Sequence, residues 1–73
     1  MNPHPIDIHV GKRLQQRRNE CGVSQTALAT AIGVSFQQVQ KYERAKDRIS
    51  ASRLYAIARF LNVDANYFFN KFP

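Results

Sequence analysis

One pattern of apolar and polar residues occurs four times along this chain. An apolar residue is followed directly by Ser or Asp, and a second apolar residue lies five positions after the first; the copies begin at Val23, Val34, Ile49 and Val63. The Ser or Asp is a typical N-cap, because its side-chain oxygen accepts hydrogen bonds from the free N–H groups of a first helical turn. The two apolar residues then form a hydrophobic staple, so the pattern predicts helices that begin near residues 25, 36, 51 and 65.

Apolar spacing gives the extent of these helices and adds one before them. Ile6, Val10 and Leu14 recur every four residues, as on one face of a helix; Asp7 could cap that helix and Gly22 could stop it. We expect an all-α chain with helices over residues 7–20, 25–32, 36–44, 51–61 and 65–70. Residues 1–6 contain two prolines and no periodicity, which predicts a flexible arm.

Length and composition fit a single small domain over residues 1–73. Hydrophobic residues make up 44% of the 73 positions, which is enough for a core and argues against disorder. Lys and Arg number 11 against 5 Asp and Glu, a net charge of +6. This surplus favours a polyanionic partner, either nucleic acid or an anionic membrane.

Other features argue against a membrane or an exported protein. No apolar run approaches the roughly 18 residues of a membrane span. The first residues lack the basic and apolar regions of a secretory signal. The basic helix expected at residues 7–20 lacks the bulky aromatic-rich face of a membrane-surface helix. Cys21 is the single cysteine, which excludes an internal disulfide and fits a reducing compartment. We expect a cytoplasmic, nucleoid-associated protein without a membrane partner.

The helix expected at residues 36–44 has two different sides. At about 100° per residue, Val39, Tyr42 and Glu43 fall on one side. The opposite side and the flanks are rich in amides and cations, and they hold Phe36, Gln37, Gln38, Gln40, Lys41 and Arg44.

A polar helix face ordinarily does no more than meet solvent. This face, however, is poor in acids, begins with two adjacent glutamines and belongs to a basic chain. Gln can pair with adenine N6 and N7, Lys can donate to guanine O6 and N7, and Phe can contact a thymine methyl. We therefore interpret the helix as a reader of base edges in a DNA major groove, with Gln37 and Lys41 as its main readers.

Residues 24–50, SQTALATAIGVSFQQVQKYERAKDRIS, resemble the helix-turn-helix of the lambda-repressor/Cro-type (XRE-like) bacterial and phage transcription regulators. The resemblance covers about residues 10–69. Its marks are Ser24-Gln25, Leu28-Ala29, Gly33-Val34-Ser35, Tyr42-Glu43, Ser50 and Ile57-Ala58 with Leu61. The resemblance implies a compact lambda-repressor-like bundle of five helices with the helix-turn-helix at its second and third.

The resemblance also implies roles for individual residues. Base edges would be read by Phe36, Gln37 and Lys41, while Gln38 and Gln40 would read bases or bind the backbone. Phosphates would be bound by Gln25, Arg44, Lys46 and Arg48, and Gln25 could also brace Gln37. Arg18 would pair with Glu43 and tie the first helix to the third, because an inward-facing carboxylate needs a partner.

The chain departs from the family pattern at two positions. Ala45 follows the recognition helix where the family usually has Gly, and Ala65 stands where it often has Pro. If position 45 needs a positive φ, alanine there costs about 1 kcal/mol or more. Alternatively, the helix runs on slightly. Neither change removes an expected DNA contact.

The sequence does not indicate an enzyme, a cofactor or a metal site. It contains no Ser/His/Asp set, paired acids or phosphate-binding Gly loop. His4 and His9 lack a Cys or carboxylate set at ligand spacing, and we interpret Cys21 as a small packing residue rather than a nucleophile.

The C-terminal segment YFFNKFP is dense in aromatic residues. Phe68 completes the last staple and is expected in the core. Phe69 and Phe72 cannot both be hidden by so short a tail. We expect them either to pack partly on the helix at 51–61 or to contact a second copy, and we favour a homodimer interface because exposed aromatic clusters mark interfaces.

These observations predict a sequence-specific regulator of transcription in a bacterium or phage that binds double-stranded DNA. We expect a dimeric repressor that reads an inverted repeat in the major groove through its third helix. Two alternatives stay open: a controller of a restriction–modification system, and an antitoxin-like module whose main task is to bind a protein. Activation is also open, because it depends on a small surface patch that sequence does not mark.

Overall fold

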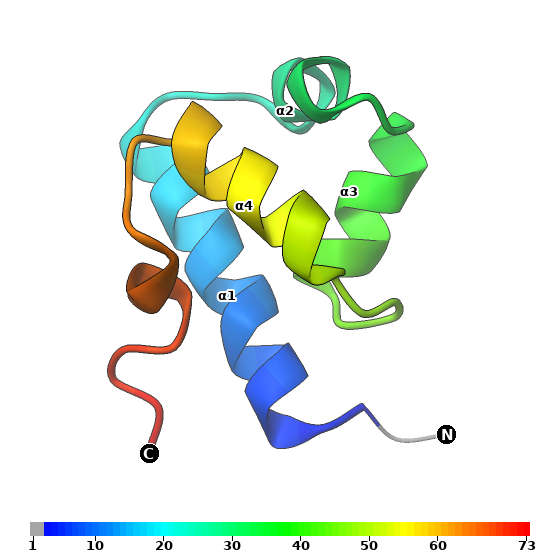
Figure 1. The fold of residues 1–73 in the computed structure, drawn as a ribbon. Coiled ribbons are helices and arrows are strands. Elements are labelled where there is room, and N and C mark those ends of the chain that lie inside the picture. The colour runs from blue at the N-terminus through cyan, green and yellow to red at the C-terminus, as the bar shows by residue number, and fades with distance from the viewer. Residues whose placement is uncertain (1–2) are drawn as a thin grey trace.

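The computed structural model describes residues 3–73, which form four α-helices and one 3₁₀ turn around a common core (Figure 1). The elements are α1 (Pro5–Glu20), α2 (Gln25–Ile32), α3 (Phe36–Glu43), α4 (Ala51–Phe60) and the 3₁₀ turn η1 (Ala65–Phe68). In Figure 1, α4 crosses in front of α1, α2 lies at the top, and α3 and η1 lie on opposite sides of α1. No helix within residues 3–73 has both the length and the apolarity needed to cross a bilayer.

Each of the four predicted caps makes the expected hydrogen bond. The hydroxyl of Ser24 accepts from the backbone N–H of Ala27 at 3.0 Å, and those of Ser35 and Ser50 do the same for α3 and α4. The carboxylate of Asp64 accepts from Asn66 N–H at 2.9 Å at the start of η1. The apolar residue before each cap packs against the core: Val23, Val34, Ile49 and Val63. Local sequence therefore sets where these elements begin.

The prediction of a fifth α-helix over residues 65–70 is wrong. The segment closes i→i+3 bonds, from Tyr67 N–H to the Asp64 carbonyl at 2.9 Å and from Phe69 N–H to the Asn66 carbonyl at 3.0 Å. This one turn already buries Phe68 completely, whereas Phe69 beside it stays exposed. A second turn would add little apolar burial, and short helical pieces readily take the 3₁₀ form.

The first helix begins earlier than predicted. α1 starts at Pro5, and the ring nitrogen Nδ1 of His4 caps it by accepting from Ile6 N–H at 3.0 Å. Proline at the first helical position was the missed signal, because its fixed φ suits that position and it needs no hydrogen-bond partner. Residues 5 and 6 of the predicted arm thus lie in the helix, and residues 1 and 2 lie outside the described residues. α3 and α4 each end one residue before the predicted boundary.

The core draws side chains from every element. The most deeply buried side chains are Leu14, Leu28, Val39, Ile57, Leu61 and Phe68, each at most 1% exposed. They come from α1, α2, α3, the end of α4 and η1. Because no element can bury its apolar side alone, the position of α3 depends on all the others.

Gly11 allows α1 to touch the backbone of α3. A Cβ atom at this position would lie 2.7 Å from the carbonyl oxygen of Tyr42 and 2.8 Å from that of Glu43. Both neighbours are backbone atoms at the end of α3, so they cannot turn away as a flexible side chain would. The close approach fixes the C-terminal end of α3 against α1.

Ala45 ends α3 in a left-handed conformation, with φ of +55°. Lys46 N–H donates to the Lys41 carbonyl at 2.8 Å, and Ala45 N–H donates to the Tyr42 carbonyl at 3.2 Å. These two bonds form a Schellman motif, which requires a positive φ at the first residue after the C-cap, here Ala45. Position 45 therefore needs the conformation that glycine adopts most easily, and α3 does not run on.

Replacing Gly11 tests the contact between α1 and α3. We expect Gly11→Ala to lower the free energy of unfolding by about 1–3 kcal/mol through overpacking. The higher helix propensity of alanine would by itself raise that free energy by about 1 kcal/mol. Urea unfolding followed by circular dichroism measures the change. Gln15→Ala, on the exposed side of α1, is the control and should stay within about 0.5 kcal/mol. A more stable Gly11→Ala protein would contradict the close contact.

Replacing Ala45 with glycine should raise the free energy of unfolding instead. Ala45→Gly relieves the left-handed strain, and we expect a gain of up to about 1 kcal/mol in unfolding free energy after the entropy cost of glycine. Thermal or urea unfolding measures it. Ala31→Gly, at an exposed helical position in α2, should lose about 0.5–1 kcal/mol. Losses at both positions would argue against the strain at Ala45.

Candidate nucleic-acid interface

α2 and α3 are joined by a tight turn that begins at Gly33, where φ is +75°. Ser35 then caps α3 and sets its first turn. Val39, Tyr42 and Glu43 of α3 are buried, whereas Phe36, Gln37 and Lys41 are exposed on the other side. Gln38 and Gln40 are half-buried on the flanks. The structure thus exposes three of the five predicted base readers on a helix whose opposite side is in the core, with the other two at the edges of that surface.

A buried ion pair holds that helix in place. Arg18 of α1 donates from Nε to Glu43 Oε2 at 2.6 Å and from Nη2 to Glu43 Oε1 at 3.2 Å. Both residues are only 9% exposed. Arg18 also donates from Nη1 to the Val23 carbonyl at 2.9 Å, so its position is braced by the chain that enters α2. The predicted partners Arg18 and Glu43 therefore meet at the junction of α1 and α3.

Gln25 of α2 joins this pair. Its amide nitrogen donates to Glu43 Oε1 at 2.9 Å, so the carboxylate accepts from both α1 and α2. Sequence reasoning assigned Gln25 to a phosphate and to the bracing of Gln37. The structure instead directs its amide nitrogen into the protein.

The loop after α3 exposes the predicted phosphate ligands and two acids beside them. Arg44, Lys46 and Arg48 are exposed around an open pocket of about 310 Å³ that Asp7 and Asp47 also line. Arg48 Nε lies 3.1 Å from Asp7 Oδ2, and 76% of the Arg48 side chain is exposed. Such an exposed ion pair contributes little to stability, so the guanidinium can exchange Asp7 for another anion.

Sequence reasoning missed Asp7 and Asp47 as part of this site. Asp47 Oδ2 accepts from the amide nitrogen of Gln38 at 3.0 Å, which joins the loop to the first turn of α3. The signal was present in the sequence, because Asp47 is an acid between Lys46 and Arg48. Only the fold, however, brings Asp7 to this loop.

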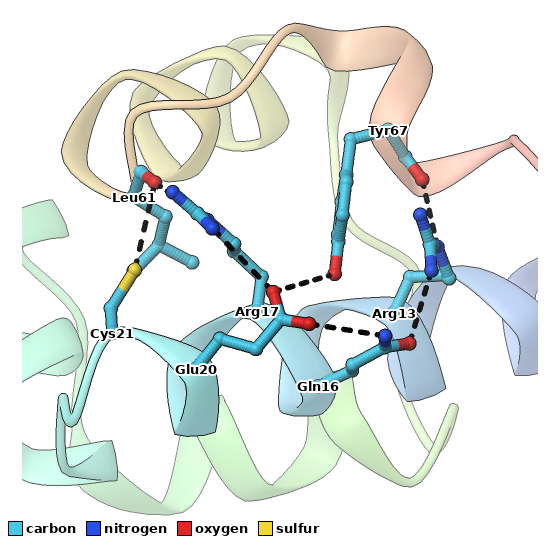
Figure 2. A network of polar contacts seen from close by, with 7 residues as sticks. All are labelled: Arg13, Gln16, Arg17, Glu20, Cys21, Leu61 and Tyr67. Carbon is cyan, nitrogen blue, oxygen red and sulfur yellow. Dashed lines mark hydrogen bonds and ion pairs between the residues drawn. The ribbon is translucent and has the colours of Figure 1, made fainter.

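Two of the four cations on α1 bind the C-terminal segment. Figure 2 shows Arg13 and Arg17 reaching across to the end of α4 and to η1. Arg13 Nε donates to the Tyr67 carbonyl at 2.9 Å, and its guanidinium lies 3.8 Å from the centre of the Tyr67 ring. Arg17 Nε donates to the Leu61 carbonyl at 2.9 Å. These arginines are structural, so the net charge overstates the cations available to a polyanion.

Glu20 and Tyr67 complete the network in Figure 2. Glu20 Oε1 accepts from the Tyr67 hydroxyl at 3.4 Å, and its other oxygen accepts from Gln16 at 3.2 Å. Burial raises the pKa of the Tyr67 phenol further above neutral, where a tyrosine hydroxyl is protonated in any case and can donate to Glu20. Cys21 is exposed, with its thiol 3.8 Å from the Leu61 carbonyl, and so is not the packing residue that we expected.

Phe69 and Phe72, the predicted dimer contacts, are 47% and 41% exposed. Phe72 meets the ring of His9 edge to face at 5.4 Å, and His9 Nε2 lies 2.7 Å from the Asn70 carbonyl. The tail therefore packs on α1. His9 holds the tail and His4 caps α1, and residues 3–73 contain no cluster of three His, Cys, Asp or Glu able to hold a metal.

The buried pair predicts a clear difference between two carboxylates. Glu43→Ala would leave Arg18 charged and unpaired in the interior, and we expect a loss of about 3 kcal/mol or more in unfolding free energy. Glu20→Ala removes an exposed ion pair with Arg17 and the exposed hydrogen bonds from Gln16 and Tyr67, and it should cost at most about 1 kcal/mol. Urea unfolding of both variants gives the comparison. Equal losses of stability in the two variants would mean that Glu43 does not stabilise the contact between α1 and α3.

Comparison with known proteins adds an independent line of evidence. A helix-turn-helix family model matches residues 14–68. A relative from Rhodospirillum rubrum, described as an uncharacterized transcriptional regulator in the ATPase CF(0) region, is 58% identical over 67 residues. That match covers 92% of this chain and 62% of the relative. The chain spans about half the length of other curated relatives.

Several solved structures share the fold. The restriction–modification controller protein C.AhdI from Aeromonas hydrophila aligns with a TM-score of 0.80 and 27% identity, covering 85% of this chain and 94% of that one. The P22 c2 repressor in complex with a synthetic operator aligns with a TM-score of 0.75 and 27% identity, covering 81% of this chain and 89% of that one.

Proposed function

Since this chain belongs to the XRE-type helix-turn-helix family of transcriptional regulators, we propose that it binds double-stranded DNA sequence-specifically and represses transcription. The observation that carries this proposal is the setting of α3. Its inner side is anchored by the buried Arg18–Glu43 pair, while Gln37 and Lys41 stand exposed on its outer side. A rigidly held helix with free amides and cations suits the major groove.

Two groups of residues divide the work in this proposal. Base edges are read by Phe36, Gln37, Gln38, Gln40 and Lys41. Phosphates are bound by Arg44, Lys46 and Arg48. Gln25 also binds a phosphate, through the amide N–H that its bond to Glu43 leaves free. The exposure of the three cations around one open pocket supports this assignment. Phosphate contacts then supply affinity that falls with salt, and base contacts supply specificity.

We further propose that the protein acts as a homodimer on an inverted repeat. Phe69 and Phe72 leave nearly half of their surface exposed within one short segment, and such aromatic surface favours association. Two copies of α3 would then read half-sites about 34–36 Å apart on one face of the duplex. Acting on chromosomal DNA, the protein would work in the cytoplasm, on the nucleoid.

A second candidate is the control of a restriction–modification system. The likeness to the controller protein C.AhdI over 85% of this chain favours it. Both functions use the same DNA-binding surface and differ in the genes that they regulate. Mapping the bound sites in the source genome separates them, because a controller binds next to restriction and modification genes.

Selection from a pool of random duplexes tests the proposed function. At two salt concentrations, we expect enrichment of an inverted repeat with half-sites about one helical turn apart. Steeply salt-dependent binding without an enriched motif would contradict specific recognition. Absence of binding at moderate salt would leave the protein-interaction alternative.

A pair of variants tests the division between base and phosphate contacts. We expect Gln37→Ala to lose about 1–3 kcal/mol of discrimination at one base pair, with little change on random DNA. Lys46→Ala, which removes one exposed cation, should weaken specific and random DNA alike and lower the salt slope by about one. Fluorescence anisotropy over a salt series measures both. Equal losses of Gln37→Ala on the two DNAs would reject its role as a base reader.

A further inference from the structure

Asp47 is an acid on the surface proposed to bind phosphates. It is exposed, and it lines one open pocket together with Arg44, Lys46 and Arg48. A carboxylate at this place repels the DNA backbone and lowers affinity for every sequence. The hydrogen bonds of Asp47 indicate which role offsets this loss of affinity.

The carboxylate of Asp47 is held from two sides. Its Oδ2 accepts from the amide nitrogen Nε2 of Gln38 at 3.0 Å. Its Oδ1 accepts from the backbone N–H of Arg48 at 3.2 Å. Gln38 lies in the first turn of α3 and is half-buried, so the bond joins the loop to the flank of the proposed reading surface.

This contact determines which way the Gln38 amide faces. An ionised carboxylate only accepts hydrogen bonds, whereas an amide has a donating nitrogen and an accepting oxygen. The nitrogen of Gln38 must therefore face Asp47, and its oxygen Oε1 is turned away from the carboxylate. A glutamine without such a neighbour could present either atom to a base.

We propose that Asp47 is a positioning residue that determines base specificity through Gln38, an inference that rests on the proposed DNA-binding function. With its nitrogen held, Gln38 presents Oε1 as an acceptor to the base edge. Exocyclic amino groups donate in the major groove at adenine N6 and cytosine N4, whereas guanine and thymine present acceptors there. Gln38 then favours adenine or cytosine over guanine or thymine at one position of one strand.

Asp47→Asn tests this orientation with almost no change in shape. Asparagine both donates and accepts, so Gln38 becomes free to turn its amide. We expect the preference for adenine or cytosine at one position to fall about tenfold, the size of one good base contact. Random-duplex selection followed by sequencing gives this ratio at every position. Gln38→Ala should lose the preference at the same position.

Asp7→Asn is the matched control. Asp7 lines the same pocket, and its substitution removes one negative charge as well. It alters a contact with Arg48, however, and none with Gln38. Both substitutions should raise affinity for all sequences by a similar factor, because each removes one negative charge near the phosphates. Only Asp47→Asn should change the base preference. Melting temperatures check that both variants remain folded.

The outcomes separate the two levels of the proposal. If the unsubstituted protein enriches no motif, the proposed function fails. If it enriches a motif and Asp47→Asn keeps the same base ratios, or if Gln38→Ala alters a different position, the role of Asp47 is overturned while DNA recognition stands. A lowered melting temperature with unchanged base ratios would show that Asp47 only shapes the loop.

Discussion

Glu43 carries a negative charge into the interior at the point where α1, α2 and α3 meet. Burying an unpaired carboxylate is too costly for a small domain to tolerate, so its two oxygens must find donors. Arg18 supplies two hydrogen bonds from α1, and Gln25 supplies one from α2. These bonds have strict geometry, unlike apolar contacts, which many arrangements satisfy. The ion pair therefore determines how α3 is oriented on the helices behind it.

The rest of the structure accommodates this placement of α3. Gly11 leaves room for the α3 carbonyls to touch α1, and Ala45 accepts a strained φ so that the chain can turn sharply after α3. Elsewhere on α1, Arg13 and Arg17 bind backbone carbonyls of the C-terminal segment. These arginines hold the fold together, whereas Arg44, Lys46 and Arg48 stay exposed after α3.

The sequence predicted much of the candidate site because helical geometry places residues on faces from their spacing alone. Val39 and Tyr42 are buried and Gln37 and Lys41 are exposed, as the rotation per residue requires. The resemblance to XRE-type regulators is confirmed by the family match over residues 14–68. The partners of exposed polar side chains were not predictable in this way, because Asp7 reaches Arg48 only through the packing of α1 against the loop.

The sequence by itself determined where the helices start, since caps and staples act within a few residues and need no distant partner. It also determined which side of each helix is apolar. Tertiary structure decided that the last segment is a single 3₁₀ turn, because Phe68 fills the core within one turn. It decided too that Gln25 bonds inward to Glu43 and that Asp47 holds Gln38. Those contacts depend on how separate elements approach one another, which no local rule specifies.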